Sequence, residues 1–149
     1  MKTLKLNFIA MILLAAVSLL NAREMGVVIA GKDVSVQELS KTELANIFLG
    51  KKTNWEDGTR IMIGYMMTPA ETVDGFFDEV VGRSHRRFKK YWVKKVFAGY
   101  GIAPKLFKNM EKALEFIEQN AGCIAFVTVS DIRELGDAKV VSITGKTGF

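Results

Sequence analysis

Apolar residues recur at two different spacings along this chain, and the spacings predict alternating strands and helices. Four short runs rich in apolar residues favour strands: Val27–Ala30, Ile61–Met66, Cys123–Val129 and Lys139–Ile143. The longer segments between them repeat apolar residues every three or four positions, which is typical of helices that bury one face. The pattern predicts an α/β fold with a mostly parallel sheet, against which each helix buries one stripe.

Capping signals mark where the first two helices begin and end. Ser40-Lys41-Thr42-Glu43 and Thr68-Pro69-Ala70-Glu71 both have the spacing of a capping box, in which a hydroxyl and a carboxylate satisfy backbone N–H groups at the helix start. Gly50 and Gly82 follow the two apolar stripes and predict the helix ends. We therefore expect one helix between residues 40 and 50 and a second between residues 68 and 82.

Two further helices are expected later in the chain, starting at Ser84 and at Asn109. Both residues are good N-caps, and Gly99 and Gly122 predict the corresponding ends. On helical spacing, the inward residues of the third helix are Phe88, Trp92, Val96 and Phe97.

The N-terminal segment has the pattern of a secretory signal peptide. Lys2 and Lys5 precede an apolar run from Phe8 to Leu20, and a small residue, Ala22, closes it. The run is shorter than the roughly 20 residues that a membrane-spanning helix needs. The pattern predicts cleavage after Ala22, a single domain over residues 23–149, and a soluble protein in the bacterial periplasm.

Composition agrees with a single exported domain. The chain has 149 residues and a net charge of +5, which becomes +3 once residues 1–22 are removed. Cys123 is the only cysteine, so the chain cannot form an internal disulfide, and no cysteine near Ala22 could carry a lipid anchor. No second domain boundary, repeat or low-complexity tract is evident.

The residues needed for most enzyme chemistry are missing. His85 is the only histidine, and it lies beside Arg86 at an expected helix start, where we interpret it as a solvated surface residue. One cysteine and one histidine far apart give no metal-ligand spacing, and no glycine-rich loop opens a helix. We therefore predict no enzyme activity, no cofactor and no metal.

A basic segment spans Arg83 to Lys95, with seven lysines and arginines and no acidic residue. Four of its residues are expected to point away from the core: Arg86, Lys89, Lys90 and Lys94. They form either a solvated basic face or a surface for an acidic partner or a membrane. The modest net charge and the predicted export argue against nucleic acid.

Two expected helix starts are candidate anion sites, because free N–H groups and the helix dipole attract negative charge there. The first is Thr68–Thr72, although Pro69 has no N–H and Glu71 is negatively charged. The second is Lys108–Met110, where Lys108 favours an anion. At both places the alternative is a helix cap with no ligand.

Three parts of the chain match motifs of one known family. They are Leu44–Gly58, which is similar to the motif IFLGK-x-x-W-x-DG; Val81-Gly82-Arg83-Ser84 with Tyr91-Trp92 and Phe97–Gly101; and Ala121–Val127, which is similar to PGAIGYV. Over Val27 to Val129 the chain resembles the phosphate-binding-protein-like family of substrate-binding proteins of ABC transporters, in its short stand-alone form. The resemblance implies a three-layer α/β/α fold like that of type 2 periplasmic binding proteins, with a mostly parallel mixed sheet flanked by helices. It also implies a ligand-binding role without catalysis.

Our first functional hypothesis is an exported module that binds phosphate or another small anion for an ABC-type transport or sensing system. The candidate ligand residues are Thr68, Ala70, Thr72, Lys108 and Asn109, with the Gly99–Pro104 loop expected to close the site. The family's hydroxyl-rich phosphate loop is represented only by Thr68 and Thr72, and Asp74 stands where short members have an arginine. The alternative is therefore a periplasmic accessory protein that kept the fold, lost the ligand and contacts an acidic partner through the basic face.

Overall fold

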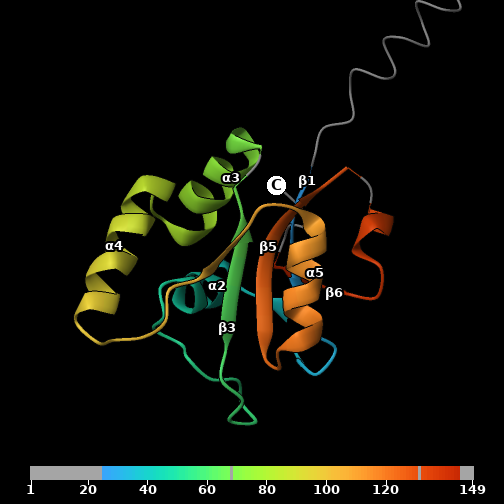
Figure 1. The fold of residues 1–149 in the computed structure, drawn as a ribbon, viewed down its shortest axis with the longest axis horizontal. Helices are drawn as coiled ribbons and strands as arrows, with labels where there is room; N and C mark the ends of the chain where they lie inside the picture. Colours follow the sequence, from blue (N-terminus) through green and yellow to red (C-terminus); the bar gives the residue numbers. More distant parts are fainter. Residues whose placement is uncertain (1–24, 68, 131, 145–149) are drawn as a thin grey trace, which may run out of the picture.

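The computed structural model describes residues 25–67, 69–130 and 132–144, so the expected signal peptide at residues 1–22 lies outside the described part. Six strands form one sheet in the order β2-β6-β1-β5-β3-β4 (Figure 1). Their bounds are β1 Met25–Ala30, β2 Glu38–Leu39, β3 Met62–Met66, β4 Lys105–Phe107, β5 Cys123–Val129 and β6 Lys139–Ile143.

The sheet is mixed and mostly parallel, as the sequence predicted. β3 runs parallel to both β4 and β5, and β2 runs parallel to β6. The central strand β1 is antiparallel to its two neighbours, β5 and β6. The four strands expected from the sequence are all present, whereas β2 and β4 were not predicted.

Helices cover both faces of the sheet and make three layers. Their bounds are α2 Lys41–Phe48, α3 Ala70–Phe76, α4 His85–Phe97 and α5 Met110–Gln119, with a π-helical turn, η1, at Phe77–Val81 and a 3₁₀ turn, η2, at Ile132–Leu135. Side chains from α2, α3, η1 and α4 pack on one face, and those of α5 and η2 pack on the other. Figure 1 shows α5 in front of the sheet and α2 behind it. The predicted α/β/α layering is confirmed.

The structure confirms one of the two expected capping boxes. At the start of α2, the Ser40 hydroxyl accepts from the Glu43 N–H, and the Glu43 carboxylate accepts from the Ser40 N–H. At the start of α3 the prediction is wrong: the N-cap is Pro69, so Glu71 is the second helical residue and not the third. Proline has no side-chain acceptor, so Pro69 makes no capping hydrogen bond. Thr68 lies outside the described residues.

The predicted core holds for most of α4 but fails at its end. Phe88 and Trp92 are buried, Trp92 being only 5% exposed. Val96 and Phe97, which the spacing placed inward, are 44% and 89% exposed. The reason is that the last turn of α4 contacts the end of α2 through Lys95, whose ammonium donates to the Leu49 and Gly50 carbonyls, and not through Val96 or Phe97.

Candidate functional site

One candidate site lies at the carboxyl edge of β3 and β4. These strands are parallel neighbours, with Met66 opposite Phe107, so the residues that follow each strand emerge at the same edge. β3 leads to α3 on one face of the sheet, whereas β4 leads to α5 on the opposite face. In open α/β sheets, ligands bind outside the strand ends where successive helices leave to opposite faces. We call this place the switch-point edge.

The structure brings the two predicted helix starts together at the switch-point edge. Ala70 and Thr72 lie in the first turn of α3, while Lys108 and Asn109 immediately precede α5. Although about 40 positions separate the two pairs in the sequence, the β3–β4 register places them along one edge. A pair of separate anion sites expected from the sequence thus becomes one shared region.

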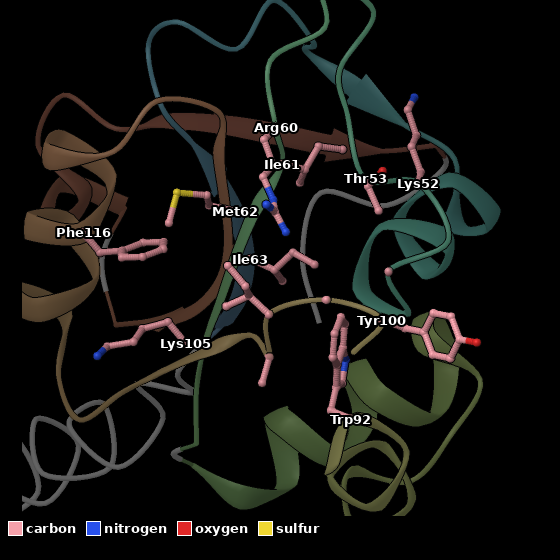
Figure 2. A pocket seen from close by; sticks show the side chains of 14 residues that line it. Lys52, Thr53, Arg60, Ile61, Met62, Ile63, Trp92, Tyr100, Lys105 and Phe116 are labelled. Atoms are coloured by element: carbon pink, nitrogen blue, oxygen red, sulfur yellow. The ribbon is translucent and has the colours of Figure 1, made fainter. Parts of the chain in front are cut away.

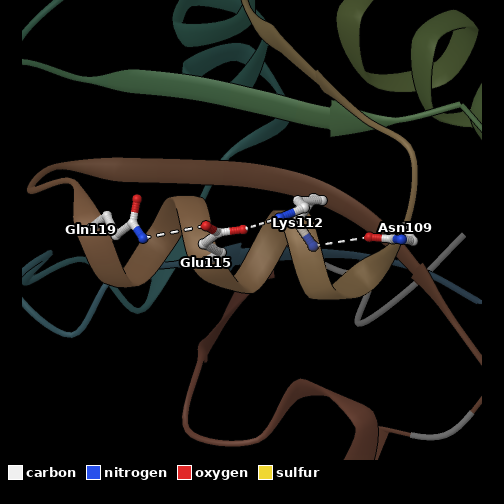
Figure 3. A network of polar contacts seen from close by, with 4 residues as sticks. All are labelled: Asn109, Lys112, Glu115 and Gln119. Carbon is white, nitrogen blue, oxygen red and sulfur yellow. Dashed lines mark hydrogen bonds and ion pairs between the residues drawn. The ribbon is translucent and has the colours of Figure 1, made fainter.

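On the α5 side, the polar groups are already arranged by local contacts. The Asn109 side-chain oxygen accepts from the Lys112 N–H at 3.0 Å, which confirms Asn109 as the N-cap. The Lys112 ammonium pairs with Glu115 at 2.6 Å, and Gln119 extends this chain of contacts along the helix (Figure 3). Among the described residues Lys108 is exposed and has no ion-pair partner, so its charge faces solvent at this edge.

On the α3 side, the first turn offers backbone groups more than side chains. Pro69 provides no cap, and Ala70 is exposed. Thr72 is half-buried, and its methyl group lies 3.1 Å from where a Cβ on Gly26 would stand, so this side chain leans on β1. Glu71 is exposed in the first turn and adds a negative charge where an anion would approach.

The Gly99–Pro104 loop does not close this site, contrary to the expectation. The loop precedes β4, and Lys105 pairs with Gly64 in β3, so the loop lies at the amino end of these strands. There it lines a cavity of about 200 Å³ together with Trp92 and Phe116 (Figure 2). The candidate ligand residues and the loop are therefore on different edges of the sheet.

This cavity, at the amino end of β3 and β4, has apolar walls and basic groups around it. Lys52, Arg60 and Lys105 line it, and no acidic residue does. Figure 2 shows the Arg60 side chain running into the middle of the cavity, while the Lys52 and Lys105 ammonium groups point away from it. The sequence analysis missed this region, because Arg60 and Tyr100 are far apart in the chain and only the β3–β4 pairing brings them close.

The four predicted basic residues of α4 are all exposed, as the helical spacing indicated: Arg86, Lys89, Lys90 and Lys94. Three of them line a shallow hollow together with Asp74 and Asp78 of the α3–η1 segment. Nearby carboxylates therefore offset part of the positive charge in the first half of the basic face. The residue spacing within α4 could not predict this, because both carboxylates belong to the α3–η1 segment.

His85 is half-buried and not a solvated residue, which corrects the sequence interpretation. Its ring packs against Tyr65 and Phe77, and its Nε2 lies 3.4 Å from the Tyr65 hydroxyl. Burial, followed by the nearby Lys89 charge, lowers the pKa of His85 below 6.5, although Asp74 acts in the opposite direction. The imidazole is consequently neutral at pH 7 and serves as a packed aromatic group.

Neither a metal centre nor a membrane span is found in the part of the chain that the structure describes. Over residues 25–67, 69–130 and 132–144, no three histidine, cysteine, aspartate or glutamate side chains lie close enough together to hold a metal ion. No helix in these ranges has the length and apolar character to cross a bilayer.

Comparison with solved structures identifies the fold. The chain matches PstS from Borrelia burgdorferi (TM-score 0.62, 11% identity, 83% of this chain and 48% of that chain). It also matches a putative phosphate ABC transporter substrate-binding protein with bound phosphate from Clostridium perfringens, with a TM-score of 0.60 and 17% identity over 83% of this chain and 47% of that chain. A third match is a phosphate binding protein from Stenotrophomonas maltophilia, with a TM-score of 0.56 and 15% identity over 83% of this chain and 40% of that chain. No protein-family profile matches the sequence, and no curated protein matches it significantly.

These matches establish the fold class. The chain has the fold of phosphate-binding proteins of ABC transporters, at low sequence identity. It spans about half the length of the proteins it matches. The fold expected from the sequence motifs is therefore confirmed.

Proposed function

We propose that this protein is an exported, periplasmic binding module that takes phosphate or another small anion at the switch-point edge, for an ABC-type transport or sensing system. The observation that carries the proposal is the convergence of two helix starts, with Lys108 between the strand and α5, at the place where open α/β sheets bind ligands. The fold shared with a phosphate-bound substrate-binding protein supports the same assignment.

The chemistry at this edge suits a weakly held anion. The start of α5 presents unpaired N–H groups and the positive end of the helix dipole, and Lys108 adds a full charge. Glu71 and Glu111 each place a carboxylate in a first helical turn. These two negative charges repel an anionic ligand, so we expect the affinity to be low. The repulsion is weaker for a singly charged anion than for phosphate dianion.

The role we propose is binding without catalysis. The matched proteins are substrate-binding proteins, which supports this assignment. His85 packs against the aromatic rings of Tyr65 and Phe77, and the proposal gives it no catalytic role.

The proposal is tested by native mass spectrometry of the protein purified from periplasm, followed by calorimetric titration with phosphate, sulfate and acetate. Lys108→Gln should weaken anion binding by about two- to fivefold, the range expected for an exposed charge pair. Lys32→Gln is the matched control, because Lys32 is also an exposed lysine but pairs with Asp137 elsewhere. Absence of heat with all three anions would refute the proposal.

Asn109→Ala separates a binding role from a capping role. The substitution should cost about 0.5–2 kcal/mol of stability through loss of the α5 cap, and it should also weaken anion binding. Ser40→Ala removes the cap of α2 and should cost a similar amount without affecting binding. If Asn109→Ala binds anions as tightly as Ser40→Ala does, Asn109 caps α5 and has no role in binding.

The accessory-protein alternative is distinguished by the exposed basic face. Neutralising Arg86, Lys89, Lys90 and Lys94 together should leave an anion titration unchanged if the ligand binds at the switch-point edge. If no anion binds, and capture of an acidic partner depends on these four residues, the accessory role replaces our proposal.

A further inference from the structure

Exposed apolar side chains are concentrated at one end of the molecule. Among the described residues, eight large apolar side chains are exposed, and six of them fall between positions 93 and 106. We call this group the apolar tip; its members are Val93, Val96, Phe97, Tyr100, Ile102 and Leu106. A concentration of this kind marks a surface that contacts another apolar phase or molecule.

The apolar tip is built on a well-fixed part of the fold. It comprises the last turns of α4, the connecting loop and the edge strand β4; in Figure 1 this segment runs from the end of α4 back towards β3. Beneath it, the Trp92 indole is buried and hydrogen-bonded to Phe48. Gly101, with φ near +136°, lies beside this ring, and a Cβ added to it would stand 3.6 Å from the indole. The chain therefore holds the exposed side chains outward on a fixed support.

The most prominent of these side chains are largely exposed, although Tyr100 and Ile102 also border the cavity of about 200 Å³ and Phe97 borders a hollow beside α4. Phe97, Tyr100 and Ile102 are 89%, 74% and 71% exposed. An exposed aromatic ring, a phenol and a branched aliphatic chain close together in the chain suit entry into a fluid interface, where aromatic residues with a polar end are favoured.

Positive charge surrounds the apolar tip. Residues 80–110 contain nine lysines and arginines and no acidic residue. Lys94 and Lys105, which lie among these apolar residues in the chain, are exposed. Lys95 instead donates to the Leu49 and Gly50 carbonyls and ties the helix end to α2. The tip thus combines protruding apolar groups with unpaired cations, which complement a surface that is both apolar and anionic.

We propose that the apolar tip docks the protein on an anionic lipid bilayer. Phe97, Tyr100 and Ile102 enter the interface between headgroups and acyl chains, and the neighbouring lysines contact lipid phosphates. An acidic protein strand is the less suitable occupant, because β4 has only three residues and begins with Lys105, features that disfavour addition of a further strand. The proposal does not depend on anion binding at the switch-point edge.

The test is sedimentation of the naturally processed full protein with lipid vesicles. Vesicles of phosphatidylglycerol and phosphatidylcholine should bind the protein, and vesicles of phosphatidylcholine alone should bind it at least tenfold more weakly. The double variant Phe97→Ser/Tyr100→Ser should lose about tenfold or more in partitioning. Ile132→Ser is the matched control, because Ile132 is exposed but lies on η2, outside the tip.

Each alternative outcome overturns the proposal. The first is that the protein binds both vesicle types equally, and the second is that the double variant binds vesicles as well as the wild type does. The third is that the wild-type protein and the double variant both bind soluble polyglutamate. The last result would assign the surface to an acidic protein. Urea unfolding should show that the double variant is as stable as the wild type. Its phosphate titration should also match that of the wild type, so failure of the lipid-docking proposal would not count against the proposed anion site.

Discussion

The indole N–H of Trp92 donates a hydrogen bond to the backbone carbonyl of Phe48 at 2.9 Å and thereby joins α4 to the end of α2. Tyr91 and Lys95 donate to the next carbonyl, that of Leu49. The last carbonyls of a helix have no partners within the helix, so these side chains satisfy acceptors that would otherwise lack them. One side of α4 thus serves both as core and as a cap for its neighbour.

Replacing Trp92 with alanine should destabilise the protein by about 3–5 kcal/mol, because a buried aromatic ring and a buried hydrogen bond are lost together. Urea unfolding monitored by circular dichroism measures the change. Phe97→Ala, at an exposed position on the same helix, should stay within about 0.5 kcal/mol of wild type. A similar cost for both variants would mean that the orientation of α4 is wrong.

Glu71→Gln should tighten binding of an anion at the switch-point edge, since it removes a negative charge from the first turn of α3. The gain should be roughly 0.3–2 kcal/mol, and it should shrink as salt is added. Thr68→Ala should loosen binding. Glu118→Gln, on an exposed part of α5 away from its start, serves as the control in calorimetry. A gain of the same size for Glu118→Gln would indicate only a change in net charge.

His85 should titrate below pH 6.5 in the folded protein, because burial lowers its pKa. As pH falls through 6.5, the unfolded chain takes up the proton first, so stability decreases until the folded pKa is reached and is level below it. Proton NMR reports this value directly, since the chain has a single histidine. His85→Gln should remove this part of the pH dependence of unfolding.

Cys123 should be unreactive in the native protein. Its side chain is buried in β5, and burial, with a smaller effect of Asp33, raises its pKa to about 12. A thiol reagent at pH 8 should modify it only after denaturant is added, because the thiolate is the reactive form. Rapid labelling under native conditions would contradict the placement of β5 in the centre of the sheet.

Export should remove residues 1–22 and release a protein that begins at Arg23. Intact mass of the periplasmic species measures the cleavage site. A periplasmic form that retains Met1–Ala22 would refute the interpretation of this segment as a cleaved signal peptide.

The sequence predicted those parts of the fold that local patterns control. The Ser40–Glu43 box and Gly50, whose φ is +62°, act within a few residues, and the structure places the ends of α2 there. The strands that were missed have two and three residues. Such short segments have no periodicity of their own and become strands only through pairing with β6 and β3.

The error at the end of α4 has a similar cause. Helical spacing says which residues share a face but not how far the neighbouring layer extends. Val96 continues the Phe88–Trp92 stripe, yet Lys95 is the residue that contacts the end of α2 there, and Val96 is left exposed. Likewise, the sequence identified Lys108 and Ala70 as separate candidates, and only the parallel pairing of β3 with β4 placed them at one edge.

The position of β1 has a consequence for how the chain acquires its structure. This first strand lies in the middle of the sheet, and its partners Val129 and Val141 lie more than 100 positions after Met25 and Val28. Contacts of such long range slow folding, because a large loop must close before they form. During synthesis, β1 lacks its sheet partners until β5 emerges, so completion of the core waits for the last quarter of the polypeptide.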